Sequence, residues 1–213
     1  MKYFNDFLSQ IPSSLQKRLL LKKTTKKLKK GDFLYRVGDT PQSIYVVEKG
    51  LVGLTYVGLK GEEHLLRIFK VGRVHGHRSI FANEVYHSSA VALEDSEISV
   101  IPKECLFEMI KQKPEMAFHF LNVLAVELKE AELKLISRSE KDVAGRIAET
   151  LIYLTEQYPE HSWTRREIAE FCGSTTPTVI KTMAKFEEKG WISQSGRKFL
   201  ILKKKNLLSV SDD

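Results

Sequence analysis

One segment near the end of the chain, residues 164–202, restricts the fold more than any other part of the sequence. Ala169, Gly173 and Val179 follow one another at intervals of four and six residues. A small side chain is needed where two helices cross closely, and glycine is favoured where the connecting turn takes a positive φ. The spacing therefore predicts a helix, a tight turn and a second helix that buries Val179 on its inner face.

The second of these helices is expected to begin near Pro177, because a proline in the first turn costs no hydrogen bond. Its candidate N-caps are Ser174, Thr175 and Thr176. The side chains expected to point outward from its first half are Thr175, Thr176, Thr178, Lys181 and Lys185. After Gly190, two apolar runs flank Ser195 and Gly196, which predicts a β-hairpin.

A helix, a turn, a second helix and a hairpin in this order have the layout of a winged helix-turn-helix, which docks on DNA. The alternative is an amphipathic helical hairpin that only packs a core. We favour the DNA-binding interpretation because the small residue, the glycine, the branched residue and the hairpin coincide in one segment.

The distribution of charge agrees with a polyanionic partner for this segment. The chain has a formal net charge of +7, and residues 165–205 carry ten Lys and Arg against four Asp and Glu. Acidic residues in the preceding helix and at the C-terminus offset this local excess. A second basic block, residues 17–30, holds eight Lys and Arg and no acid. Such runs are most often solvated surfaces.

Short apolar runs, rich in β-branched and aromatic residues, dominate residues 33–101, and turn residues separate them. Many short strands at close spacing are typical of an antiparallel barrel or jelly roll. The predicted strands cover residues 33–35, 44–47, 51–57, 65–69, 88–92 and 98–101. Before them, apolar residues on either side of Pro12 predict two short helices.

Two more helices follow the predicted barrel. Pro102 begins a short one, and Pro114 begins a much longer one. Along the longer helix, apolar side chains recur at alternating steps of four and three residues, at Ala117, Leu121, Leu124, Leu128, Ala131 and Leu135. Such a narrow seam pairs two helices as a coiled coil, so we expect a symmetric homodimer. The alternative is that the seam packs on its own barrel, as we expect of Phe118, Phe120 and Val123.

Residues 139–142, Ser-Glu-Lys-Asp, interrupt the seam and supply caps for a new helix over about residues 143–157. The expected fold class is therefore α+β. It comprises an N-terminal antiparallel jelly-roll sensor domain (residues 1–113), a long dimerisation helix (114–138), a hinge (139–142) and a C-terminal winged helix-turn-helix domain (143–213).

No apolar run approaches the ~20 residues needed to span a bilayer, and the N-terminus lacks the apolar core of a secretory signal. We therefore expect a cytoplasmic protein with no membrane partner. The two cysteines, Cys105 and Cys172, are far apart and lie within predicted helices. This placement favours buried, reduced thiols over a zinc or iron–sulfur site.

The order of these parts resembles the Crp/Fnr superfamily of bacterial transcription regulators. Local stretches that resemble it are residues 30–32 (KGD), 38–39 (GD), 44–50 (IYVVEKG), 142–151 (DVAGRIAETL) and the whole of 164–202. The likeness covers nearly the whole chain. It implies a homodimeric, sequence-specific DNA-binding regulator rather than an enzyme, with double-stranded DNA and RNA polymerase as partners and a small-molecule effector for the barrel.

The predicted barrel departs from the members that bind cyclic nucleotides. Those members hold the ribose with a carboxylate and the cyclic phosphate with an Arg–Ser pair, in a cassette that corresponds here to residues 72–92. Arg73 stands at the carboxylate position, and residues 86–89 (Tyr-His-Ser-Ser) offer no arginine. Ala131 and Glu132 replace the Thr–Ser pair that meets the base. The resemblance thus argues against cyclic AMP as the ligand, and the lack of an N-terminal cysteine cluster argues against an iron–sulfur cofactor.

The cassette remains rich in donors, so another anion is a candidate effector, and a degenerate pocket is the alternative. Its candidate residues are Arg73, His75, His77, Arg78, Ser88 and Ser89. Because residues two apart in a strand point to the same side, His75 and His77 leave a haem- or metal-dependent sensor as a further alternative. A jelly-roll metal enzyme is a weaker one, since Glu84 and His87 lack the spacing of cupin ligands.

The recognition helix departs from the family as well. Members commonly read base edges with an Arg, a Glu and a second Arg, which correspond here to Thr176, Pro177 and Lys181. Proline cannot accept a hydrogen bond from cytosine as glutamate does, so we expect an operator different from the common TGTGA or TTGAT half-sites. The side chains expected to contact phosphates and set the register are Arg165, Arg166, Arg197 and Lys198.

Overall fold

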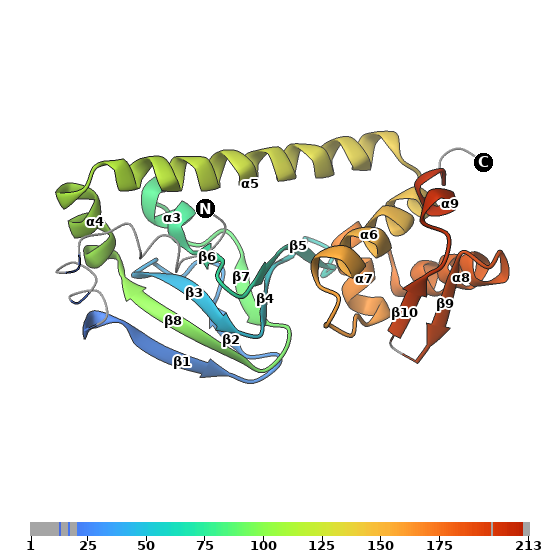
Figure 1. Cartoon of the computed structure of the whole chain (residues 1–213), viewed down its shortest axis with the longest axis horizontal. Helices are drawn as coiled ribbons and strands as arrows, with labels where there is room; N and C mark the ends of the chain where they lie inside the picture. The colour runs from blue at the N-terminus through green and yellow to red at the C-terminus, as the bar shows by residue number, and fades with distance from the viewer. Residues whose placement is uncertain (1–12, 14–16, 18–20, 197, 211–213) are drawn as a thin grey trace. The chain divides into compact units, whose positions relative to one another are not determined.

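The computed structural model describes residues 13, 17, 21–196 and 198–210 (Figure 1). The described residues form two compact units. The first contains residues up to Val57 together with Leu66–Glu127, and the second contains Gly58–Leu65 together with the chain from Leu128 onward. The two helices predicted on either side of Pro12 lie almost entirely outside the described residues.

The first unit is built on two four-stranded sheets of antiparallel pairs, in the orders β1-β8-β3-β6 and β2-β7-β4-β5. The six predicted strands are all present. They are β2 (Phe33–Tyr35), β3 (Ser43–Lys49), β4 (Leu51–Val57), β5 (Glu63–Lys70), β7 (Ser89–Ala92) and β8 (Ser96–Pro102). The jelly-roll prediction is confirmed.

Three further elements of this unit were not predicted: β1 (Thr24–Leu28), β6 (Val74–His75) and α3 (His77–Ala82). Strand β1 lies inside the basic block and pairs with β8, with Thr24 opposite Val100 and Leu28 opposite Ser96. Of its five residues only Leu28 is buried. As an edge strand it has little apolar pattern to detect, and its exposed lysines discourage pairing with other chains.

The sheet that contains β3 and β8 is buried on both of its faces. Val47 and Ile98 belong to the core between the two sheets, whereas Ile44 and Ile101 face a second core. This second core is completed by α3, by α4 (Lys103–Gln112) and by the beginning of α5 (Glu115–Glu140). Because side chains of a strand alternate between its faces, one strand supplies both cores.

The start of α5 packs on the first unit through Met116 and Phe120, which are both buried. Val123 is half-buried. The expected packing of Phe118 on the barrel is wrong, because this ring is 70% exposed. Phe118 lies three residues before Leu121, so it continues the apolar seam instead of the buried face.

Aromatic rings fill the core between the sheets. Tyr35 stacks on Tyr86 with 3.7 Å between ring centroids, and the His75 ring stacks on Phe69 at 4.6 Å. Tyr45 lies 5.4 Å from both Tyr35 and His75. His75 is therefore a component of an aromatic core. Neither of its ring nitrogens has a hydrogen-bond partner among the described residues.

The second unit contains α6 (Val143–Gln157), α7 (Arg165–Cys172), α8 (Thr176–Glu188), a hairpin of β9 (Ile192–Ser195) and β10 (Lys198–Ile201), and α9 (Lys204–Leu208) (Figure 1). Ile147, Leu151 and Ile168 are fully buried where α6 meets α7. The predicted helix-turn-helix and hairpin are confirmed.

The break between α5 and α6 is short. Helix α5 continues through Glu140, and Asp142 caps α6 by accepting a hydrogen bond from the Gly145 amide at 2.6 Å. A Cβ on Gly145 would lie 2.7 Å from the carbonyl oxygen of Val210, so this position has no room for a side chain. In the Asp-x-x-Gly pattern of residues 142–145, the aspartate is thus explained by capping and the glycine by lack of space.

Cys105 and Cys172 are buried in α4 and α7, as predicted, and they do not form a disulfide bond. Burial raises the pKa of the Cys172 thiol. In the described part of the chain, no helix has both the length and the apolar character needed to cross a membrane.

The buried His75 predicts acid sensitivity of the first unit. Burial, helped by the nearby charge of His77, lowers the pKa of His75 from 6.5 to about 3. The unfolded chain binds a proton here below about pH 6.5 whereas the folded chain does not, so this residue should lower the free energy of unfolding by about 2 kcal/mol between pH 7 and pH 5.

A His75→Phe substitution should remove this contribution, because phenylalanine suits an aromatic core and does not titrate. Urea denaturation at both pH values measures the effect. An equal loss of stability in the variant and in the native protein would contradict the assignment.

Candidate nucleic-acid interface and sensor site

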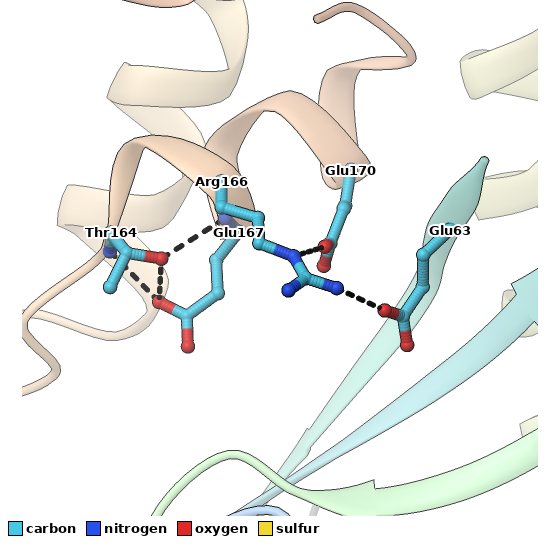
Figure 2. Close-up of polar contacts among 5 residues, drawn as sticks. All are labelled: Glu63, Thr164, Arg166, Glu167 and Glu170. Atoms are coloured by element: carbon cyan, nitrogen blue, oxygen red, sulfur yellow. Dashed lines mark hydrogen bonds and ion pairs between the residues drawn. The ribbon is translucent and has the colours of Figure 1, made fainter. Parts of the chain in front are cut away.

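Helix α7 begins with a capping box that fixes its direction (Figure 2). The Thr164 hydroxyl accepts a hydrogen bond from the Glu167 amide at 3.1 Å, and the Glu167 carboxylate accepts one from the Thr164 amide at 2.8 Å. Two backbone amides at the helix start, which have no partner within the helix, are thereby satisfied. Helix α7 ends at Gly173, whose φ of 69° confirms the predicted left-handed turn. The Thr-x-x-Glu signature was present in the sequence and marks this helix start.

Helix α8 follows after three residues, 173–175. Thr175 is its N-cap and accepts a hydrogen bond from the Thr178 amide at 3.3 Å, and Pro177 lies in the first turn. Val179, Met183 and Phe186 form its buried inner face. The opposite face therefore points into solvent, with Thr175, Pro177, Lys181 and Lys185 exposed and Thr176 and Thr178 half-buried. Ser174, in the turn, is half-buried too.

Two exposed residues of this outer face were missed by sequence reasoning. Ile180 is 53% exposed, and Ala184 is also exposed. They lie three and seven residues after Pro177, so all three share one face of the helix. The predicted set contained only polar residues and the proline, because apolar residues in a helix are normally assigned to the core. The signal that could have identified Ile180 and Ala184 is their position around the helix relative to the buried Val179.

Arg165 does not project freely from α7. Its Nη2 donates to Gln194 Oε1 at 2.6 Å and to the carbonyl of Gly196 at 3.4 Å. Gln194 in turn donates its backbone amide and its Nε2 to the Glu187 carboxylate at 2.7 and 3.0 Å. This network joins the start of α7, the hairpin and the end of α8. Partial burial lowers the pKa of Arg165.

Arg166, the next residue, is 68% exposed but is already occupied by two carboxylates (Figure 2). Its Nε donates to Glu170 Oε1 at 2.6 Å, and its Nη2 donates to Glu63 Oε2 at 2.7 Å. Hydrogen bonding to Glu170 and the charges of both acids raise the pKa of Arg166. A phosphate contact by this arginine has to replace at least one of these ion pairs.

The hairpin predicted as the wing has Ser195 opposite Lys198 at its end, with a turn that includes Gly196 at a φ of 59°. Lys198 is exposed. Arg197, the other predicted phosphate contact on the wing, lies outside the described residues.

The candidate effector residues do not converge on one point. His75 faces the aromatic core, whereas His77, the first residue of α3, lies against Phe120 of α5 at 5.9 Å between ring centroids. Ser89 accepts a hydrogen bond from the Val37 amide at 3.0 Å and so supports the neighbouring loop. Arg73 is half-buried beside β6.

Arg78, His87 and Ser88 form a chain of polar contacts. Arg78 Nη2 lies 2.9 Å from His87 Nδ1, and His87 Nε2 lies 3.4 Å from the hydroxyl of the buried Ser88. Arg78 also pairs with Glu84 at 3.5 Å. Partial burial and the charge of Arg78 lower the pKa of His87.

A charged cluster on α5 was missed by sequence reasoning. Glu127 Oε2 lies 2.7 Å from Arg67 Nη1 and 3.6 Å from the buried His77 Nε2, a distance too long for a hydrogen bond. Burial alone would raise the pKa of Glu127, but its interactions with His77 and Arg67 lower it. Arg67 also donates to the Glu127 carbonyl at 3.3 Å. The partners lie on β5, α3 and α5, so no local pattern could reveal them.

His75 and His77 therefore occupy different surroundings, on opposite sides of Gly76. Within residues 21–196 and 198–210, no group of three or more His, Cys, Asp or Glu side chains is arranged to hold a metal ion.

The seam predicted along α5 is largely solvent-exposed in the single chain. Leu121, Leu128 and Leu135, at intervals of seven residues, are 57%, 61% and 70% exposed. Ala131 is exposed, and Ala117 and Leu124 are half-buried. Large apolar residues repeated along one exposed helix face are typical of an interaction surface.

Two parts of the chain match known domain families. Residues 25–113 match the cyclic nucleotide-binding domain, and residues 145–210 match the Crp-like helix-turn-helix domain. The cyclic AMP receptor protein of Thermus thermophilus is 30% identical over 162 residues, which cover 75% of this chain and 75% of that protein. The chain belongs to the Crp/Fnr family of transcription regulators.

Other Crp/Fnr proteins are also similar to this chain over most of its length. The CRP-like cAMP-activated global transcriptional regulator of Mycobacterium tuberculosis is 29% identical over 191 residues, covering 83% of this chain and 85% of that protein. The structure of FixK2 from Bradyrhizobium japonicum matches with a TM-score of 0.80 at 19% identity, covering 90% of this chain and 98% of that one. This last match confirms the fold.

The Glu63–Arg166 ion pair predicts a measurable effect on DNA affinity. Replacing Glu63 with Gln should remove one of the two ion pairs of Arg166, leave its Nη2 available to a phosphate and raise the affinity for a random duplex about twofold, since exposed ion pairs are worth on the order of 0.5 kcal/mol. Fluorescence anisotropy at fixed, moderate salt concentration measures it.

Glu62→Gln is the matched control, because it makes the same change in net charge one residue away, at an exposed position. Equal gains from both variants would show that long-range charge, and not release of Arg166, is responsible.

Proposed function

We propose that this protein is a homodimeric, sequence-specific DNA-binding regulator of transcription that acts in the cytoplasm together with RNA polymerase. The observation that carries the proposal is the solvent-exposed outer face of α8, whose first turn contains no acidic residue. A helix of this kind, with its inner face anchored on a preceding helix and a wing beside it, fits the major groove of DNA.

The surrounding side chains supply contacts of two kinds. Lys181, in the second turn of α8, is placed to reach a base edge, where its ammonium group donates to guanine O6 or N7. Lys185, Lys198 and Arg166 are placed to neutralise phosphates, which adds affinity without sequence information. Arg165 makes its contribution chiefly by bracing the wing through Gln194.

The exposed seam of α5 supports dimerisation. An isolated chain that leaves Leu121, Leu128 and Leu135 in water loses the free energy of burying them, and a second copy of α5 provides a complementary surface. A two-fold dimer presents two copies of α8 to half-sites about one helical turn apart.

The barrel acts as a sensor in this proposal, and its signal is something other than cyclic AMP. The names of two relatives favour cyclic AMP. The residues of the cassette do not, because they offer Arg73 where a carboxylate is needed and no arginine next to Ser88 in the sequence. Stacked pairs of rings, Tyr35 with Tyr86 and Phe69 with His75, also belong to the core between the sheets.

Lys181→Ala should reduce discrimination at one base pair of each half-site by about 1–3 kcal/mol, because it removes a contact to a base edge. Arg166→Ala should instead weaken binding to all duplexes alike and lower the salt slope by about one, as expected for a phosphate contact. Anisotropy titrations against a panel of single-base-pair variants separate the two. The roles assigned here are wrong if both variants lose the same affinity on specific and random DNA.

Leu128→Glu should convert the dimer into a monomer, because it places a charge in the centre of the seam. Leu133→Glu is the matched control, since Leu133 is 54% exposed on another face of the same helix. Light scattering coupled to size-exclusion chromatography measures the mass of each. The assignment would be contradicted if the native protein were already monomeric, or if the Leu128→Glu variant remained a dimer.

A further inference from the structure

The exposed face of α8 carries an apolar row. Pro177, Ile180 and Ala184 follow one another along this face at intervals of three and four residues, and all three are exposed. Ile180, at 53% exposure, is the largest of them. Lys181 and Lys185 lie beside this apolar row, one on each turn.

Together, the apolar row and the two lysines beside it can donate hydrogen bonds but cannot accept them. Proline, isoleucine and alanine side chains neither donate nor accept, and lysine only donates. Among the threonines nearby, the Thr175 and Thr178 hydroxyls lie 2.8 Å apart and are bonded to one another, and Thr175 also caps the helix. Over residues 177–185 this face therefore lacks a carboxylate or amide that could accept from the amino group of cytosine or adenine, and the exposed Glu188 follows only at the end of α8.

Among the groups that bases present in the major groove, the C5-methyl of thymine is the apolar one, and it is matched by apolar side chains. The same base pair offers thymine O4 as an acceptor, which suits a lysine on the next position. An exposed isoleucine flanked by two lysines is thus complementary to a thymine within a polyanionic groove. The positive charge beside the row favours this occupant over an apolar surface of another protein.

We propose that Ile180, supported by Pro177 and Ala184, recognises the methyl group of thymine in the operator half-site. This inference rests on the proposed function. Specificity at that position comes from the fit of an apolar surface rather than from a hydrogen bond. The half-site therefore contains at least one thymine that uracil cannot replace without loss.

Replacement of single thymines by deoxyuridine tests this inference, because uracil keeps the base pair and its acceptors and removes only the methyl. The full-length protein is first used to select a duplex from random sequences, and each thymine of the selected half-site is then replaced in turn. At one or two positions the replacement should weaken binding about fourfold per methyl, from the burial of one methyl-sized group.

Ile180→Ala should make the protein bind the thymine and uracil duplexes equally well at those positions. Leu208→Ala is the matched control, since Leu208 is likewise apolar and 62% exposed but lies on α9. This control should keep the full preference for thymine. Circular dichroism of both variants establishes that they are folded.

The outcomes separate this inference from the function on which it rests. If no duplex is bound better than random DNA, both fail. If a site is selected but uracil is tolerated at every position, or if Ile180→Ala keeps the preference for thymine, only the inference is overturned. The last result is the one expected if Ile180 faces a protein partner instead of DNA.

Discussion

Burial of the inner face of α8 is the constraint on which the DNA-facing surface depends. Val179 and Met183 are fully buried, and α8 packs against α6 and α7, which bury Leu151 and Ile168. Because a helix is rigid, fixing these residues inward fixes Pro177, Ile180 and Lys181 outward. The capping box at Thr164 and the left-handed turn at Gly173 set the direction in which α7 delivers the chain to α8. The reading surface therefore follows from packing, and its chemistry follows from only a few exposed side chains.

The sensor barrel has an aromatic interior and a separate polar cluster. Its interior is occupied by stacked aromatic rings, including a neutral histidine, so the space between the sheets is a core. A polar cluster lies elsewhere, where Arg67 and the buried His77 meet Glu127 of α5. Since α5 also carries the exposed leucine seam, an event that disturbs this cluster acts directly on the helix proposed to join two chains. Such an event shifts a two-state equilibrium only if it favours one state of the cluster.

Much of this organisation could be predicted from the sequence, and the limits have physical causes. The bounds of α6 followed from Asp142 and the apolar spacing after it, and Gly173 and Val179 located the turn and the inner face of α8. Strand β1 was missed because an exposed edge strand has no alternating pattern. Ile180 was missed because an isoleucine in a helix is assigned to the core unless its angle to Val179 is considered. The pairing of Glu63 with Arg166 joins residues 103 positions apart and leaves no local trace.

The most direct test of the central claim is a selection of bound duplexes from random DNA by the full-length protein. A two-fold symmetric site is predicted, with half-sites about ten base pairs apart from centre to centre. Its half-site should contain thymine and differ from TGTGA and TTGAT, because Thr176 and Pro177 replace the usual reading residues. Recovery of either common half-site, or of unrelated sequences without symmetry, would contradict the account.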